Sequence, residues 1–323
     1  GGSIIVEAGN IVKGQGGNIS IISGQSETHK SGNINIRTAE AEKNGVGTGT
    51  FKMGSGDSKN GVAGNVLVMA GSGKSVNRAG NVTISAGKNY NGNGGNILLE
   101  SGESSSRRHR SGNLYMQSAS HGKYSGGSGN IYLRTGEAKS AAAGNISISA
   151  GDVVGSDGAP GSLFLSAGSS SGSMHGGTAG QVVIQSGDHL NSGKSGPIKV
   201  KTGASNGGSS GSLEIFTGKV DNYRGISGSL QFFTGSSGDG KSGDMVLETG
   251  YGGAAGSIRM MPGNSTQRAG ANLFLSGGSS EKDKGGKVSI LGGNSDLAAS
   301  GAVTIGTPQS TQGQSGSILL STG

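Results

Sequence analysis

The chain of 323 residues contains no cysteine, no tryptophan, four prolines and few aromatic residues. Without cysteine there is no disulfide framework and no thiolate metal site. No apolar run approaches the roughly 18 residues that cross a bilayer, so no membrane span is expected. Scarce proline, together with 70 glycines that do not recur at every third residue, excludes collagen.

Acidic residues are outnumbered, with 19 Asp and Glu against 26 Lys and Arg, which gives a net charge of +7. Such an excess can attract an anionic polysaccharide or a mineral surface, whereas the simpler interpretation is a set of solvated loops with a mild basic excess. We expect no nucleic-acid partner. The chain has no signal peptide and starts inside a repeat, which suggests a segment of a longer chain or filament.

A short repeat organises the whole sequence. Residues 80–87 read GNVTISAG and residues 144–151 read GNISISAG, and variants of this phrase begin 21 times. Most copies start 15–17 residues apart, with one spacing of 19 and one of 13. We number each copy from position 0, its opening glycine, to position 7, and call the polar stretch before the next opening residue a connector. Such regularity is typical of a solenoid or array.

Positions 2 and 4 are apolar in all 21 copies, for example Ile146 and Ile148. This period of two predicts a strand with one buried face. Positions 0 and 6 share that face and are small. Positions 1, 3 and 5 face outward. Asn occupies position 1 in nine copies, where it either forms a hydrogen-bonded ladder or simply tolerates the corner backbone.

One copy cannot fold alone. Two apolar side chains contribute roughly 3–6 kcal/mol of burial, whereas ordering about 15 residues of backbone costs roughly 15–30 kcal/mol. The sequence therefore predicts an all-β, parallel β-solenoid in which residues 1–323 form a single continuous array of stacked copies. One strand or two strands per rung are possible, and two are favoured because identical apolar layers then cover each other.

The pattern glycine, asparagine, apolar, any, apolar, any, serine or threonine, glycine resembles the Gly- and Ser-rich β-solenoid arrays of microbial and algal cell surfaces and extracellular fibres. The likeness spans the whole chain. It implies a role in a surface fibre or in adhesion, and it transfers no active site.

No sequence motif points strongly to catalysis, phosphate binding or metal binding. Residues 235–242 match the phosphate-loop pattern, but a strand rather than a helix is expected to follow. The period is too long for a calcium-binding nonapeptide roll, and the five histidines lie in connectors without ligand spacing. Carboxylates are scattered without a paired set. We expect no enzyme, no cofactor and no metal.

Three surface features remain as candidates. Arg107, Arg108 and Arg110 form the densest basic cluster, which is either an anion-binding site or a solvated loop. Asn264 lies in a connector and is the most accessible N-glycosylation sequon. Large apolar residues at outward position 3 of alternate copies suggest lateral packing rather than the uniform Thr array of an ice-binding face. These residues are Leu67, Leu98, Tyr132 and Phe164.

The sequence thus predicts a structural protein that self-associates into an extracellular or cell-surface filament by stacking its repeats. The alternative is an adhesin-type module for an anionic polysaccharide or mineral surface, and an ice-binding solenoid is disfavoured.

Overall fold

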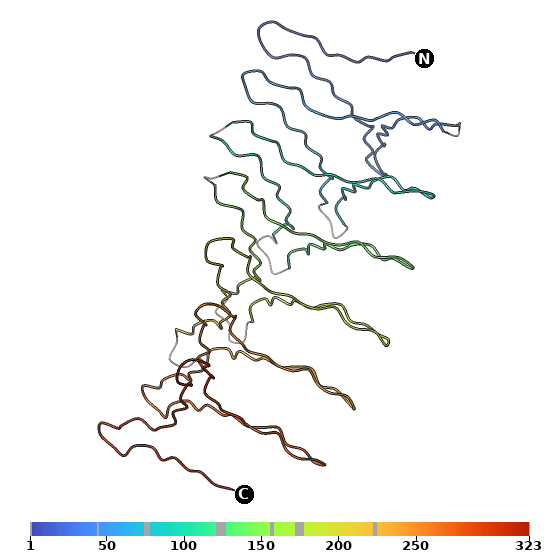
Figure 1. Cartoon of the computed structure of the whole chain (residues 1–323). Coiled ribbons are helices and arrows are strands. Elements are labelled where there is room, and N and C mark those ends of the chain that lie inside the picture. The colour runs from blue at the N-terminus through green and yellow to red at the C-terminus, as the bar shows by residue number, and fades with distance from the viewer. Residues whose placement is uncertain are drawn as a thin grey trace. The chain divides into compact units, whose positions relative to one another are not determined.

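The computed structural model describes residues 2–43, 45–73, 78–106, 108–120, 127–155, 158–171, 178–221 and 225–322. Within these ranges the chain forms no α-helix and no β-strand, and it consists of extended coil interrupted by bends (Figure 1). The prediction of an all-β, parallel β-solenoid with two strands per rung is therefore wrong.

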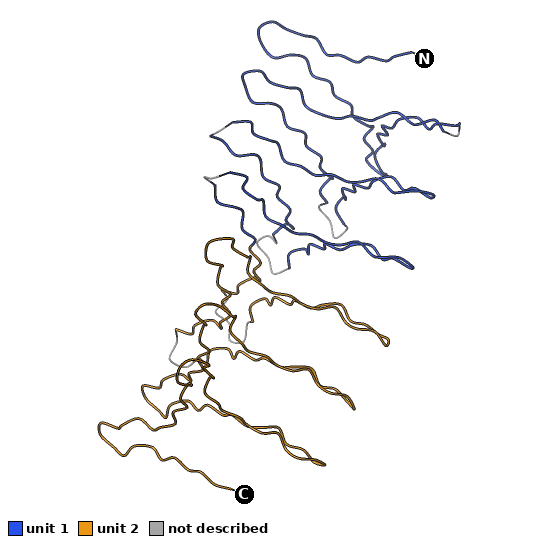
Figure 2. Cartoon of the chain, in the orientation of Figure 1, with its two compact units in different colours: residues 1–163 blue, residues 164–323 orange. Residues whose placement is uncertain are grey.

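The chain divides into two units, Gly1–Leu163 and Phe164–Gly323 (Figure 2). Each unit consists of repeat copies joined by connectors, and in each the trace turns back at the connectors (Figure 1). The prediction of a single continuous array over residues 1–323 stays a prediction. Leu67 and Phe164, two of the residues expected to take part in lateral packing, lie in different units.

Many connectors are closed at their base by one backbone hydrogen bond. The N–H of the opening residue donates to the carbonyl oxygen of position 7 in the preceding copy, at 2.8–3.2 Å. The connector thereby returns the chain to the point where it left the previous copy. The ten bonds run to Gly9 from Gly17, Gly24 from Gly32, Gly71 from Gly80, Gly87 from Gly95, Gly102 from Gly112, Gly151 from Gly161, Gly168 from Gly180, Gly187 from Gly196, Gly278 from Gly286 and Gly293 from Gly301.

Short polar side chains shape the connectors between these bases. The hydroxyl of Ser26 accepts a bond from the N–H of His29, three residues on, at 3.0 Å, and Ser295 does the same for Ala298. Such local bonds are the reason that serine favours turns. Gly14 and Gly207 lie in connectors with φ of 120° and 108°, a backbone region that favours glycine.

The absence of a sheet has a simple physical cause. A ladder requires successive N–H to C=O bonds along two neighbouring segments. In the described part of the chain the connector bases contribute one bond each, and no second bond between the flanking segments extends it into a ladder. The apolar alternation therefore does not produce strands with a buried face in the described part of the chain.

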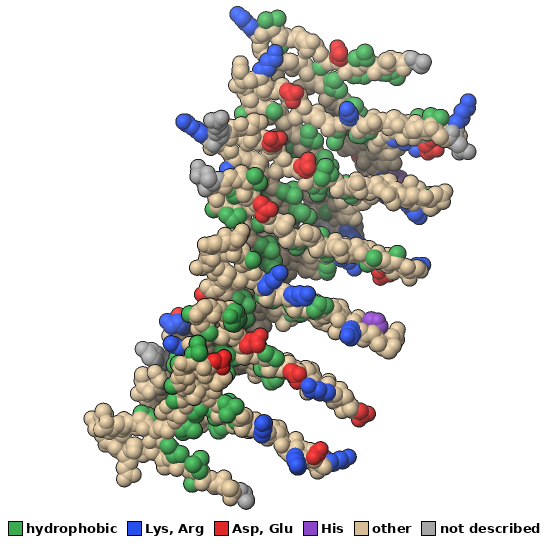
Figure 3. Space-filling view, in the orientation of Figure 1, with side chains coloured by type: hydrophobic (Ala, Val, Ile, Leu, Met, Phe, Trp, Pro, Cys, Tyr) green, Lys and Arg blue, Asp and Glu red, His purple; other side chains and the backbone are tan. Residues whose placement is uncertain are grey.

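The two sides of each copy remain distinct. Position 2 is less exposed than outward position 3, with 50% of Ile146 and 49% of Ile258 open to solvent, whereas Phe164 and Phe274 at position 3 are 87% and 85% exposed. None of the described residues is buried. Figure 3 shows hydrophobic side chains at the surface of both units, interspersed with charged ones. The expected core is thus an exposed apolar stripe, made of positions 2 and 4.

The total exposed surface agrees with the absence of a core in the described ranges. The chain exposes 33991 Å², whereas a compact protein of 31.5 kDa exposes about 12,000 Å² and a fully extended chain about 46,000 Å². A compact domain of this length buries about 75% of its extended surface, and this chain buries about a quarter.

Candidate interaction surfaces

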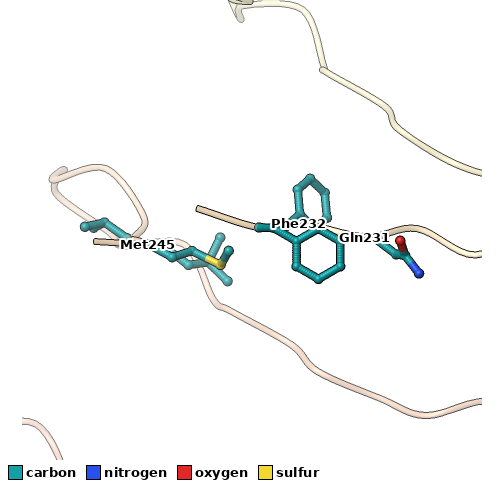
Figure 4. Close-up of a pocket in the computed structure, with 6 residues that line it drawn as sticks. Gln231, Phe232 and Met245 are labelled. Atoms are coloured by element: carbon teal, nitrogen blue, oxygen red, sulfur yellow. The ribbon is translucent and has the colours of Figure 1, made fainter. Parts of the chain in front are cut away.

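An open groove lies between two consecutive copies in the second unit. Gln231, Phe232 and Phe233 line it from one side, and residues 245–247 (Met, Val and Leu) line it from the other. Its volume is about 560 Å³, and all these apolar side chains are exposed. Figure 4 shows Phe232 and Met245 on two separate stretches of chain. We call this feature the 231–247 groove.

A second hollow of about 510 Å³ lies along one copy in the first unit, against Ile34, Asn35, Ile36 and Arg37. Polar surface dominates its lining, and only one segment contributes to it. It therefore lacks the facing apolar walls that the 231–247 groove offers.

The sequence reasoning missed the 231–247 groove. It placed Phe233 among the outward residues and Phe232 on the inward face, and did not connect either residue with the next copy. A usable signal was present, because Phe232 and Phe233 are adjacent phenylalanines at positions 4 and 5. Only the structure shows that the segment after the connector faces them.

The four candidates for lateral packing, Leu67, Leu98, Tyr132 and Phe164, are all exposed. The hydroxyl of Tyr132 accepts a bond from Asn130 Nδ2 at 2.8 Å, and Tyr115 accepts one from Asn113 at 2.9 Å. Positions 1 and 3 therefore share a face, as the alternation predicts. In the described residues these Asn side chains bond tyrosine, and no Asn ladder is present. The lateral interface itself stays a prediction.

The basic cluster is described only in part, because Arg107 lies outside the described residues. Arg108 and Arg110 are exposed, and neither forms an ion pair with a described residue. The Ser106 hydroxyl accepts a bond from the Arg108 N–H at 3.3 Å and lies 2.9 Å from His109 Nδ1. Ser106 thus bonds two described residues of this loop, and anion binding by Arg107, Arg108 and Arg110 stays a prediction.

The phosphate-loop match at residues 235–242 gains no support. A phosphate loop needs a helix N-terminus beside its glycines, and the described residues after it contain no helix. Lys241 Nζ lies 3.1 Å from Asp244 Oδ1 in an exposed ion pair, so its charge already has an acidic neighbour.

The described histidines make local bonds. His29 Nδ1 lies 2.9 Å from the Thr28 hydroxyl, and His189 Nδ1 accepts a bond from the Gly193 N–H at 3.1 Å. Among the described residues no group of His, Asp and Glu is placed to hold a metal ion. His121 and His175 lie outside the described residues.

The sequon at Asn264 lies in an exposed connector. The neighbouring Ser265 hydroxyl accepts a bond from the Arg268 N–H at 3.0 Å. The sequons at Asn18, Asn81 and Asn145 are exposed as well, so accessibility does not single out Asn264. Its glycosylation stays a prediction.

Comparisons with known protein families, with curated proteins and with solved structures gave no match. The resemblance to surface β-solenoid arrays therefore has no support from a related protein. In the described ranges, no helix is long and apolar enough to cross a membrane.

Proposed function

We propose that the protein is a structural component that works as an assembly of many copies, in which neighbouring chains cover each other's apolar stripes. The observation that carries this proposal is the 33991 Å² of exposed surface, with no buried residue in the described part of the chain. A single chain of this kind gains too little from burial to offset the loss of conformational entropy. Contacts between chains supply the missing burial.

The available area is more than sufficient. A stable protein complex buries about 1,200–2,000 Å² in total. The surface here exceeds that of a compact chain by about 22,000 Å², so covering a tenth of the excess matches one such interface.

A second copy of this chain is the partner that fits the pattern best. Every copy carries apolar residues at positions 2 and 4, flanked by small residues at positions 0 and 6. A neighbouring chain therefore presents an apolar stripe with the same spacing. Both charge signs are present, with 26 basic and 19 acidic side chains, so ion pairs between chains can offset part of the net charge of +7. An extracellular or cell-surface filament is the form of assembly that we propose.

The 231–247 groove is where we expect the strongest single contact. Binding energy in interfaces concentrates on a few large side chains, aromatic ones above all. Phe232 is 62% and Phe233 is 82% exposed, so much of each ring is available to a second chain. Met245 and Leu247 form the opposite wall and can adapt to an inserted side chain.

Replacing both rings should weaken association. In sedimentation velocity over a concentration series, we expect the native chain to grow from monomer to large species. Phe232→Ser with Phe233→Ser should raise the midpoint concentration about tenfold or more, because two exposed rings lose about 1.5–3 kcal/mol of burial between them. The matched control is Ser236→Ala with Ser237→Ala in the adjoining connector, which should leave the midpoint within about twofold.

A native chain that remains monomeric over the whole series would contradict the proposed self-association. If the Phe232→Ser, Phe233→Ser variant and the serine control associate equally well, the 231–247 groove is not part of the contact between chains.

A further inference from the structure

The residue at position 6 separates the closed connectors from the open ones. A connector is closed when its opening residue bonds the position 7 carbonyl, and open when no such bond to a described residue forms. All five copies with Ala and both copies with Gly at position 6 precede a closed connector, and none of the seven copies with Thr that are followed by a connector does. The seven are Thr38, Thr135, Thr202, Thr217, Thr234, Thr249 and Thr307.

Neither connector length nor the residue at position 7 explains this division. Gly87 and Gly95 lie eight residues apart and form a closed connector, whereas Gly235 and Gly243 lie eight residues apart and form an open one. Position 7 is glycine in both. The clear difference at the base of the two connectors is Ala86 in the first and Thr234 in the second.

In closed connectors the position 6 side chain packs directly on the opening glycine. A Cβ added to Gly95 would lie 3.4 Å from Ala86 Cβ and 3.3 Å from Gly87 N, and one added to Gly161 would lie 3.0 Å from Ala150 Cβ. These distances leave little room, so the opening residue is glycine because the two backbones approach closely there.

In six of the seven open Thr connectors, the threonine Cβ or Cγ2 is the atom nearest to a Cβ added to the opening glycine. The contact is tightest at Gly144 and Gly316, where Thr135 Cγ2 and Thr307 Cγ2 lie at 3.3 Å and no backbone atom comes within 4 Å. At Gly243 the Thr234 Cβ and Cγ2 lie at 3.9 and 4.0 Å, and at Gly211, after Thr202, nothing lies within 4 Å. Where the methyl is in contact, the second branch at Cβ stands between the two backbones and keeps them too far apart for a hydrogen bond.

Serine, with no methyl branch, occurs in both states. Ser23, Ser101 and Ser186 precede closed connectors, and Ser55 and Ser118 precede open ones. A hydroxyl alone therefore does not prevent closure, and a connector can also be open without a methyl at position 6. In the open connector between Gly250 and Gly256, the Thr249 hydroxyl donates a bond to the Gly256 carbonyl oxygen at 3.3 Å.

We infer that a threonine methyl at position 6 holds its connector open, and that this opening creates the 231–247 groove. Thr234 lies directly after Phe233, and the groove is formed by the two segments that flank its connector. The other hollow, along Ile34 to Arg37, also ends directly before a threonine, Thr38. Thr234 is thus a positioning residue that separates the walls of the groove.

Amide hydrogen exchange tests this inference in the dilute single chain, independently of any assembly. Thr234→Ala should allow the Gly243 N–H to bond Gly235, which slows its exchange about fivefold, the effect of one typical hydrogen bond. The reciprocal change, Ala86→Thr, should break the bond from Gly95 to Gly87 and speed exchange of the Gly95 N–H by a similar factor. Exchange at Gly180 serves as the internal reference.

Thr234→Val distinguishes the methyl from the hydroxyl. Valine keeps the branch, so exchange of the Gly243 N–H should stay at the native rate. Slowed exchange in Thr234→Val, unchanged exchange in Thr234→Ala, or unchanged exchange in Ala86→Thr would each overturn the inference. The measurement is made on single chains, so none of these results bears on the proposed self-association. That proposal is tested separately by sedimentation velocity.

Discussion

Heating the chain in dilute solution should produce no cooperative unfolding peak. A globular protein of 323 residues absorbs about 230 kcal/mol on unfolding near 60 °C, at about 0.7 kcal/mol per residue. That heat comes from the loss of packed, hydrogen-bonded structure, and the described residues contain none that is buried. Differential scanning calorimetry should therefore record a small fraction of this heat, spread over a broad range of temperature.

The same sample above the concentration at which it assembles is the internal control. Chains that cover each other's apolar stripes should show a transition whose temperature rises with concentration, since association stabilises only the assembled form. A sharp peak of full enthalpy at the lowest concentration would mean that the single chain has a core, and would contradict the proposed structural role.

Removing the apolar stripe from three consecutive copies should nearly abolish assembly. The change is Leu213→Ser, Leu230→Ser and Met245→Ser, three position 2 residues that are 51–63% exposed in the single chain. Burying the exposed half of each side chain is worth about 1 kcal/mol. Losing three such contributions raises the assembly midpoint about 100-fold, as measured by light scattering over a dilution series.

The matched control changes outward serines in the same copies. Ser212→Ala and Ser229→Ala, both at position 1, should shift the midpoint by no more than about twofold. If these variants and the stripe variants assemble alike, the stripe does not hold the chains together.

The sequence correctly indicated the repeat, and it indicated which side of each copy is the less exposed one. The alternation predicted that position 2 is more sheltered than position 3, and the 50% exposure of Ile146 against 87% for Phe164 agrees. The connectors are polar and rich in residues that favour turns, and serine hydroxyls such as that of Ser26, which accepts a bond from the His29 N–H, shape them. Both features depend on neighbours close in sequence.

The fold itself could not be obtained in that way. A period of two is compatible with a sheet, but strands also require a ladder of backbone bonds between segments, and composition does not specify one. The arithmetic showed that one copy cannot fold alone, and the inference that stacking within the chain supplies the missing burial was wrong. No described residue is buried, and we propose that neighbouring chains supply the missing burial.

The difference between alanine and threonine at position 6 was invisible for another reason. Both residues are small, as the pattern requires at position 6, and the sequence offered no reason to distinguish them. Only the distances at Gly95 and Gly144 show the close backbone approach beside alanine and the methyl contact beside threonine, from which we infer that a threonine methyl holds a connector open. We infer the same origin for the 231–247 groove, which could likewise not be derived from the apolar pattern.

Small-angle X-ray scattering over a dilution series is the most direct test of the proposal. It shows whether an isolated chain lacks a core and whether chains associate as their concentration rises. At the lowest concentration we expect a particle of 31.5 kDa with a radius of gyration well above the roughly 20 Å of a compact chain of this length. As concentration rises, the mass per particle should increase many-fold. A particle of single-chain mass with a radius of gyration near 20 Å at every concentration would contradict both parts of the proposal.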